Sequence, residues 1–205
     1  MGKTMTRSLS YICGLIIKSL GISLILRSEL GADAWNGFFV AMSEWIGFTV
    51  GSWLITCGVL ITLLNAFLSK KPPNPLSLLT IVVLGFCIDF WLDTLDFHPV
   101  QLFYQVLIFW GGFLLATIGI SIYVQSKYAL TPADQLMYIL TERYAMSLTA
   151  SKTVIDGSAL LFALVLHGPL GLGTFIYTFL CGPFIQFFIP KIERLLFTDS
   201  PTTRS

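Results

Sequence analysis

The sequence predicts an all-α, polytopic membrane protein with six transmembrane helices arranged as two inverted three-helix repeats, each with a short re-entrant or interfacial helix. Three observations predict this fold class. The chain of 205 residues is 55% hydrophobic and only 11% charged, whereas soluble domains carry about 25% charged residues. Six apolar segments are long enough to span a bilayer, and the first half resembles the second at an offset of 98 residues. We expect one membrane domain over residues 1–205, with repeat one at about 9–95, repeat two at about 100–190 and a cytoplasmic tail at 191–205.

The six predicted spans follow the apolar runs of the chain. They are 9–26, 51–68, 76–95, 100–124, 149–167 and 170–190. Two amphipathic segments, 34–46 and 132–145, cover roughly 20 Å as helices, which is too short to cross comfortably. The first run does not read as a cleaved signal peptide, because Lys18 lies in its middle and Arg27 and Glu29 follow it.

The distribution of lysine and arginine predicts the orientation of these spans. With the N-terminus inside, ten basic residues fall in inner segments, only Arg27 falls outside, and Lys18 lies within a span. The ten inner residues are Lys3, Arg7, Lys70, Lys71, Lys127, Arg143, Lys152, Lys191, Arg194 and Arg204. We therefore expect a multi-pass protein of the bacterial inner (plasma) membrane with both termini cytoplasmic.

Composition and motifs also exclude several classes of function. The formal net charge is +1 and no basic patch is present, so nucleic acid is not an expected partner. The four cysteines lie in apolar runs without a close pair, which favours buried, reduced thiols. His98 and His167 lie at loop edges without ligands at metal spacing, and no catalytic nucleophile motif is visible. The sequence thus predicts no enzyme, no metal site and no cofactor.

The stretch that the chain repeats is 21–47, whose counterpart is 119–145. Five residues of the first copy are identical in the second, namely Gly21, Ile22, Ser23, Ser28 and Glu44. Each half holds three spans, an odd number, so the second copy enters the bilayer from the opposite face. Inverted repeats of this kind occur in secondary transporters, whose substrate site lies near the midplane between the repeats.

Each amphipathic segment opens with a helix-start signal. In the second copy Thr131 is the expected N-cap, Pro132 suits the first turn, and Asp134 lies near the positive end of the helix dipole. In the first copy Asp33 is the expected N-cap, and Asn36 occupies the position that matches Asp134.

Two readings of these short helices stay open. They could lie flat on opposite membrane surfaces, with Trp35 and Trp45 as headgroup anchors. Alternatively, they could be re-entrant half-helices whose N-termini meet near the midplane and offer free N–H groups to a ligand.

Ionisable residues within apolar spans are costly and are therefore candidates for function. Lys18 lies mid-span and is expected to find a carboxylate partner, and Asp89 needs a donor or a wet cavity. Both could line a cavity or serve packing and topology. Lys152 and Asp156 are spaced as a structural ion pair on one helix face, at the inner membrane edge.

Several motifs are shared with a known family. In the first half they are 30–36 (LGADAWN), 49–53 (TVGSW) and 85–89 (GFCID), and in the second half 131–137 (TPADQLM), 152–156 (KTVID), 168–174 (GPLGLGT) and 182–183 (GP). They resemble the YczE/YitT-type family of bacterial integral membrane proteins over most of residues 11–190. The resemblance implies fold and topology far more than mechanism, since members are mostly described as membrane proteins without a settled substrate.

The family pattern has a Gly-Pro-x-Asp element in each half, and this chain departs from it. The first copy has Ala34 for the proline and Asn36 for the aspartate, while the second keeps Pro132 and Asp134 but has Thr131 for the glycine. If paired carboxylates serve the family's site, the resemblance implies that this chain keeps one at the matched positions unless Asp33 substitutes.

The predicted function is that of a small-solute transporter, or permease, with a site at the repeat interface. The expected residues for binding a small polar solute are Asp33, Trp35, Asn36, Thr131 and Asp134. Lys18 or Asp89 would be proton-linked groups, and the expected partners are the lipid bilayer and a second copy in a homodimer. The alternative is a non-transporting accessory or regulatory protein that scaffolds a membrane complex, which would need no central cavity.

Overall fold

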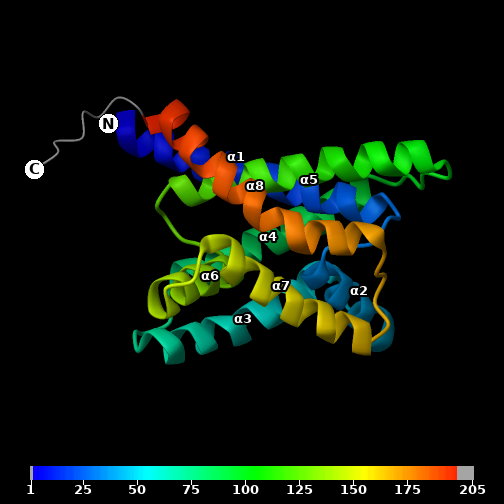
Figure 1. The fold of residues 1–205 in the computed structure, drawn as a ribbon, viewed down its shortest axis with the longest axis horizontal. Helices are drawn as coiled ribbons and strands as arrows, with labels where there is room; N and C mark the ends of the chain where they lie inside the picture. Colours follow the sequence, from blue (N-terminus) through cyan, green and yellow to red (C-terminus); the bar gives the residue numbers. More distant parts are fainter. Residues whose placement is uncertain (1, 198–205) are drawn as a thin grey trace, which may run out of the picture.

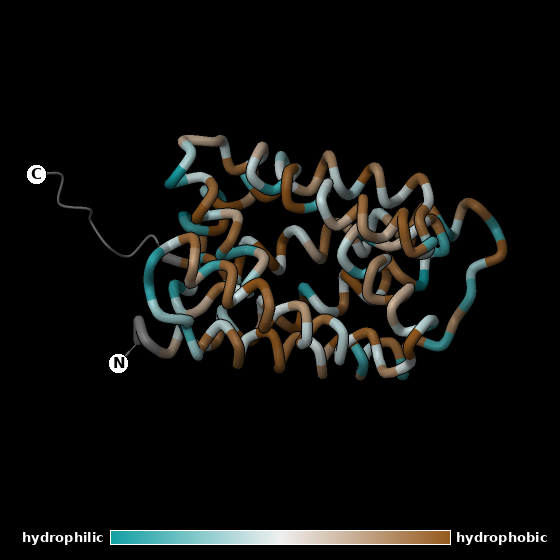
Figure 2. The backbone as a smooth tube through the Cα atoms, turned by 90° about the horizontal axis from the view of Figure 1, so that it is seen from below, coloured by the Kyte–Doolittle hydropathy of each residue, from teal (hydrophilic) through white to brown (hydrophobic). Residues whose placement is uncertain are grey.

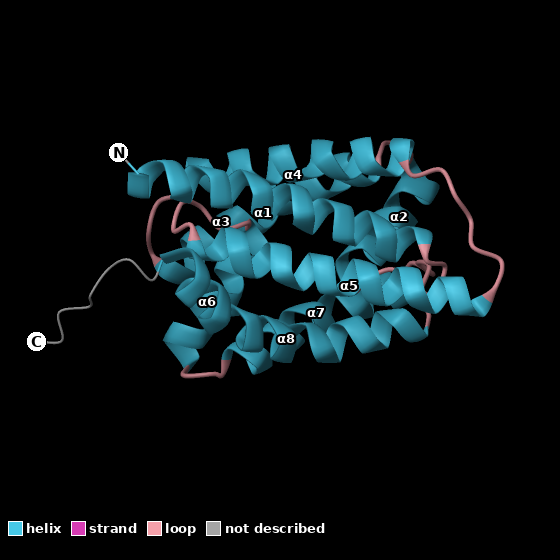
Figure 3. Cartoon of the chain, turned by 90° about the horizontal axis from the view of Figure 1, so that it is seen from above, coloured by secondary structure: helices cyan, strands magenta, loops and turns pink. Residues whose placement is uncertain are grey.

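The computed structural model describes residues 2–197, which form eight α-helices and no strand (Figure 1). The helices are α1 (Gly2–Arg27), α2 (Ala34–Ile46), α3 (Val50–Ser69), α4 (Pro75–Thr94), α5 (Leu102–Gln125), α6 (Pro132–Tyr144), α7 (Leu148–Val165) and α8 (Leu172–Phe197). Figure 3 shows the long helices running along the length of the bundle. The end of the predicted cytoplasmic tail, including Arg204, lies outside the described residues.

Six of these helices, α1, α3, α4, α5, α7 and α8, are long and apolar enough to cross a membrane. They coincide with the predicted spans to within a few residues, apart from longer outer ends of α1 and α8. Their outward faces carry large hydrophobic side chains such as Phe67 (81% exposed) and Leu172 (78% exposed), which lipid would cover. In Figure 2 hydrophobic residues dominate the long helices, and hydrophilic stretches concentrate toward the two ends of the bundle. The chain is a multi-pass membrane protein.

The two short helices, α2 and α6, lie toward opposite ends of the bundle (Figures 1 and 3). Both begin with the predicted caps. The backbone N–H of Asn36 donates to Oδ1 of Asp33 at 3.3 Å, and the N–H of Asp134 donates to Oγ1 of Thr131 at 3.4 Å. Each cap satisfies one of the free N–H groups of a helix N-terminus.

The N-terminal ends of α2 and α6 are buried, whereas their C-terminal ends are exposed. Asp33 and Thr131 are 5% and 3% exposed, while Trp45 and Tyr144 are 68% and 57% exposed. Each short helix therefore runs from the interior of the bundle to its surface.

The centre of the bundle is the crossing of α1 and α5, which glycines bring into backbone contact. A Cβ atom on Gly21 would lie 2.3 Å from the backbone nitrogen of Ala116, and one on Gly119 would lie 2.4 Å from that of Lys18. Small residues permit such close helix approach in membranes. Next to this crossing, α5 packs on α8 through Phe113, whose ring centroid lies 5.6 Å from that of Tyr177.

The helix contacts of the first half recur in the second. Within the halves, α1 packs on α4 as α5 packs on α8, α3 on α4 as α7 on α8, and α2 on α3 as α6 on α7. Between the halves, α2 packs on α7 as α6 packs on α3, and α2 touches α8 as α6 touches α4. The contact between α1 and α5 is its own counterpart, because these two helices correspond to each other in the two halves.

The turns that follow α1 and α5 have the same local structure. The Oγ of Ser28 donates to the carbonyl three residues earlier at 2.6 Å and accepts from the N–H two residues later at 3.4 Å. Ser126 makes the same two bonds at the same distances. The next residues, Glu29 and Lys127, both adopt left-handed backbone, with φ of 58° and 57°. Two residue types of unlike charge thus adopt one unusual conformation, which indicates that the surrounding turn imposes it.

Candidate functional site

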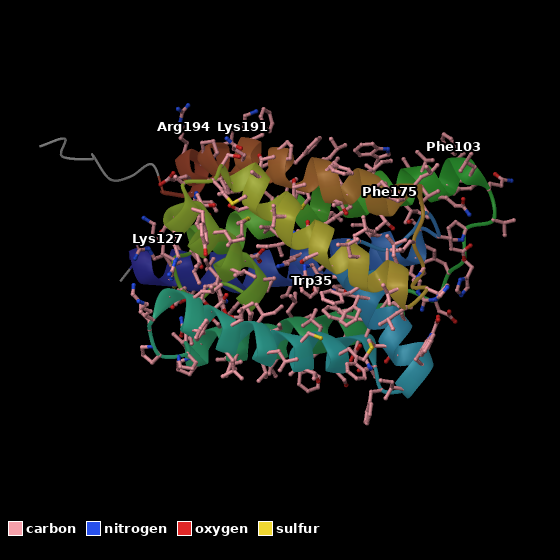
Figure 4. The ribbon with its side chains drawn as sticks, turned by 60° about the horizontal axis from the view of Figure 1, so that its bottom comes forward. Trp35, Phe103, Lys127, Phe175, Lys191 and Arg194 are labelled. Carbon is pink, nitrogen blue, oxygen red and sulfur yellow. The ribbon has the colours of Figure 1, made fainter. Side chains whose placement is uncertain are left out.

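The buried ends of α2 and α6 both line a central cavity. Its volume is about 80 Å³, which is room for several waters or a small molecule. Each of the eight helices contributes to its lining, which includes all five predicted binding residues: Asp33, Trp35, Asn36, Thr131 and Asp134. Figure 4 shows Trp35 in the middle of the bundle, far from Lys127, Lys191 and Arg194 at one end.

Asp134 is held as a carboxylate by three donors. Lys18 Nζ donates to its Oδ2 at 2.8 Å, Thr131 Oγ1 donates to the same oxygen at 2.6 Å, and the hydroxyl of Tyr123 also donates to it. Although burial alone would raise it, the charges of Lys18 and Lys152 and the hydrogen bonds from Lys18 and Thr131 lower the pKa of Asp134 to about 2. Asp134 is therefore the carboxylate partner expected for Lys18, although the two residues are 116 positions apart in the sequence.

Lys152 and Asp156 form a second buried ion pair beside the cavity. Lys152 Nζ lies 2.6 Å from Oδ2 of Asp156, and the residues are 8% and 1% exposed. The predicted pair is present, and both side chains are buried, with Lys152 on the cavity lining. Its position at the inner membrane edge stays a prediction. Lys152 is therefore a site residue rather than a surface charge.

Asp33 differs from the other buried carboxylates because it forms no ion pair with a described residue. It accepts from the backbone N–H of Asn36 at 3.3 Å and from the side-chain Nδ2 at 2.7 Å. Burial raises the pKa of Asp33 above its ordinary value, although the bonds from Asn36 and the nearby lysines oppose this shift.

Two polar atoms at the cavity have no hydrogen-bond partner among the described residues. They are Oδ1 of Asn36, an acceptor on a side chain that is 3% exposed, and Nε1 of Trp35, a donor. Buried polar atoms of this kind are costly unless something satisfies them. Since both residues line the cavity, a ligand or water there would satisfy them.

Apart from Tyr177 of α8, the rest of the lining is apolar. Most of it comes from α1, α3, α4 and α5, with Phe39 from α2, and includes Ile22, Leu54, Ile81, Leu84 and Ile120. The cavity therefore has a charged side, formed by the helix starts and two lysines, and an apolar side. This is the usual composition of a small-molecule site, in which few polar groups fix orientation against apolar walls.

Asp89 lies away from the cavity lining. Its Oδ1 accepts from the backbone N–H of Gly51 at 3.0 Å, and its Oδ2 accepts from Oγ1 of Thr49 at 2.7 Å, at the start of α3. At an offset of 97 residues, Asp89 matches Gln186, whose Oε1 accepts from Oγ1 of Thr149 at 2.7 Å, at the start of α7. The predicted coupling role of Asp89 stays a prediction that these contacts do not favour, since they fit a helix-capping role.

The comparisons with known proteins agree with the motifs that the sequence shares with a family. A family model described as a family of unknown function, DUF6198, matches residues 5–190. The chain belongs to this family. The DUF6198 chain is 35% identical over 186 residues to the uncharacterized protein YyaS of Bacillus subtilis, which covers 90% of the chain and 92% of the relative. It is 30% identical over 189 residues to the uncharacterized membrane protein YczE of the same organism, covering 91% of the chain and 86% of the relative.

A third relative, an uncharacterized protein of Haemophilus influenzae, is 28% identical over 183 residues, 88% of the chain and 82% of the relative. No solved structure matches the chain. The predicted resemblance to YczE is confirmed, and the name of that relative describes a membrane protein.

Sequence reasoning missed several residues of this DUF6198 site. Lys152, Phe39 and Tyr177 line the cavity, and the hydroxyl of Tyr123 donates a hydrogen bond to Asp134. One signal could have identified Lys152, because it and Lys18 are the lysines within the predicted spans, so both were candidates for pairing inside the bundle. The aromatic residues carried no such signal, since apolar spans are full of them. Among the described residues, no group of three or more histidine, cysteine, aspartate or glutamate side chains could hold a metal ion.

Proposed function

We propose that this DUF6198 protein is a small-solute transporter of the bacterial inner membrane, which binds its solute in the central cavity between two inverted repeats. The observation that carries the proposal is that the capped ends of α2 and α6, one from each half, line a single charged cavity inside six apolar helices. Polar cavities within a membrane bundle mark substrate and ion pathways. We assign the protein no catalytic role.

The inverted repeat is supported by reciprocal contacts at the offset of 98 residues. Gly21 lies against Gly112, and their counterparts Gly119 and Gly14 lie against each other. A two-fold axis between α1 and α5 requires such pairs, because each contact must recur with the roles of the halves exchanged. The paired helix contacts and the matching turns at Ser28 and Ser126 support the same relation.

The re-entrant reading of α2 and α6 is favoured by their burial pattern. A helix lying flat on a membrane surface would expose one face along its whole length. Here the caps Asp33 and Thr131 are buried and the opposite ends are exposed. Half-helices whose N-termini meet at a central site are a recurring device of secondary transporters.

We retain the proposed orientation with both termini cytoplasmic. Removing the buried Lys152 from the ten inner basic residues leaves nine, against one outside, so the asymmetry persists. A homodimer within the lipid bilayer is part of the same proposal, and its mass in detergent would test it.

The proposal is tested by thiol labelling from each side of sealed vesicles. The four native cysteines, Cys13, Cys57, Cys87 and Cys181, would be replaced by alanine or serine. Asn36→Cys and Ala133→Cys then place single thiols on the cavity lining from the two halves. We expect an impermeant maleimide to reach both positions through a shared aqueous path, and a transported solute to protect both.

Labelling of Asn36→Cys only from outside and of Ala133→Cys only from inside would instead indicate two surface helices. That result would remove the main support for transport and favour a non-transporting accessory protein that scaffolds a membrane complex.

A further inference from the structure

The cavity region holds unequal numbers of buried lysines and buried carboxylates. Its buried lysines are Lys18 and Lys152, and its buried carboxylates are Asp33, Asp134 and Asp156. When all five are ionised, two positive charges face three negative charges, and one negative charge is left over. An uncompensated charge within a low-dielectric bundle is strongly unfavourable, so a positive charge from outside the chain must balance it.

The contacts identify Asp33 as the unbalanced carboxylate. Asp134 is paired with Lys18, and Asp156 is paired with Lys152. Among the described residues, the carboxylate of Asp33 accepts two hydrogen bonds, both from Asn36. The compensating positive charge therefore belongs at Asp33, which is 5% exposed and lines the cavity.

The surroundings of Asp33 suit an organic ammonium group. Such a group has several N–H donors and needs more than one acceptor, and the unpartnered Oδ1 of Asn36 lies on the side chain that already contacts Asp33. Trp35 and Phe39 also line the cavity, with ring centroids 5.9 Å apart. Aromatic faces attract ammonium cations, and the apolar walls would cover a short hydrocarbon chain.

An anionic solute fits the same cavity poorly. Each lysine is already engaged with a carboxylate, and each also lies over a tyrosine ring, Lys18 at 5.0 Å from the centroid of Tyr123 and Lys152 at 5.9 Å from that of Tyr177. An anion would add a second uncompensated negative charge beside Asp33.

We propose that Asp33 binds the ammonium group of a small protonated amine, and that a single proton occupies its carboxylate when the amine is absent. The exchange is balanced: the protonated carboxyl and the ammonium cation give a carboxylate–ammonium pair and one proton released to water. This inference rests on the proposed transporter function and specifies its cargo as a cation exchanged for a proton. The raised pKa of Asp33 is in keeping with proton occupancy.

Other ionisable groups face Asp33 from the packed helices and must be considered in any pH experiment. They are Lys18 on α1, Asp134 on α6, Lys152 and Asp156 on α7, and Tyr177 on α8 with Cys181 beside it. Removing Asp33 alone separates its titration from theirs.

The test measures binding of n-butylamine to the purified full-length protein in lipid nanodiscs by calorimetry, with empty nanodiscs as the blank. At pH values below the folded pKa of Asp33, we expect affinity to rise about tenfold per pH unit, because one proton must leave for each amine bound. Titrations in buffers of different ionisation enthalpy should register that proton. The neutral analogue n-butanol and the anion butyrate should bind more weakly than the amine.

Asp33→Asn removes the charge and keeps a good N-cap residue. We expect this variant to bind n-butylamine about tenfold to a hundredfold more weakly and to lose the pH dependence. Asp93→Asn, a change of an exposed carboxylate, is the matched control and should bind as the unchanged protein does. Thermal unfolding of each variant would establish that it is folded.

Unchanged amine binding by a folded Asp33→Asn, or binding by the unchanged protein without proton release, would overturn the inference. If butyrate or butanol binds better than the amine while the labelling results hold, the cargo is wrong and the transporter proposal stands. If the labelling experiment indicates surface helices, the transporter proposal itself fails.

Discussion

The carboxylate of Asp134 accepts hydrogen bonds from three side chains, and one donor is a lysine from the middle of a membrane span. The caps Asp33 and Thr131 could be predicted from sequence because capping is local chemistry between residues three positions apart. The need of Lys18 for a carboxylate could also be predicted. Its identity could not, because the choice between Asp134, Asp89 and Asp156 depends on how distant helices pack.

Removing one partner of the Lys18–Asp134 pair should destabilise the fold more than removing both. Lys18→Met leaves Asp134 with two neutral donors and no cation, and breaking a buried pair in this way costs about 3–5 kcal/mol. Unfolding in detergent, followed by intrinsic fluorescence, should give a lower midpoint for Lys18→Met than for the double variant Lys18→Met with Asp134→Leu. Lys71→Met, at an exposed lysine, is the control and should change little. A midpoint for the double variant that is equal to or lower than that for Lys18→Met would contradict this prediction.

Because the pKa of Asp33 is raised in the fold, we expect its contribution to the stability of the fold to depend on pH. A carboxyl whose folded pKa lies above its unfolded value of 3.8 stabilises the fold fully below that unfolded value and loses this contribution as pH rises through the folded pKa. Asp33→Asn does not titrate, so it should gain stability relative to the unchanged protein as pH increases from 4 toward 8. Melting curves of both proteins across this range, without amine, test this. A difference in melting temperature between the two proteins that stays constant with pH would contradict this expectation.

At the scale of elements, the helices themselves follow from local patterns, while their depth in the membrane does not. The bounds of α2 and α6 agree with the predicted segments to within one residue, because a cap and an amphipathic run are both local signals. A surface helix and a re-entrant half-helix have the same such signals. The burial of Asp33 and Thr131 favours the re-entrant arrangement that we propose, and this burial depends on contacts with the opposite half of the chain.

Because α1 and α5 cross closely, we expect different effects of alanine substitution at two glycines of α5. A Cβ at Gly119 would lie 2.4 Å from a backbone nitrogen of α1, whereas a Cβ at Gly111 would meet nothing within 4 Å. Gly119→Ala should therefore lower the unfolding free energy by about 1–3 kcal/mol or more, since overpacking against backbone cannot be relieved by a rotamer change. Gly111→Ala should be neutral or slightly stabilising, because alanine favours helix. The melting temperatures of the two variants in the same detergent give the comparison, and equal shifts would show that the close crossing is not formed.

At the scale of the whole molecule, the two halves share a pattern of contacts although few of their residues are identical. The serines of the turns at Ser28 and Ser126 recur, as do the glycines at the crossing, where Gly14 matches Gly112 and Gly21 matches Gly119. Backbone contact and turn geometry tolerate little else. The charged residues do not follow the repeat: the counterpart of Lys18 is Ala116, and that of Lys152 is Leu54. The internal repeat could be predicted from sequence, whereas the asymmetry of the cavity charges becomes clear only when the halves are assembled.

If the two halves form the inverted repeat that we propose, the chain should have a single orientation, since it needs no oppositely inserted partner to complete the site. The basic residues Lys127, Lys191 and Arg194 lie together at one end of the bundle (Figure 4), and positive charge is retained on the cytoplasmic side. In a cysteine-free background, Val100→Cys, at a position 93% exposed in the α4–α5 loop, should be labelled by an impermeant maleimide on intact spheroplasts. Lys127→Cys, in the α5–α6 loop, should be labelled only after the membrane is opened. Labelling of both positions on intact spheroplasts would mean that the chain inserts in two directions, and the asymmetric charges of its cavity would then face each side of the membrane in turn.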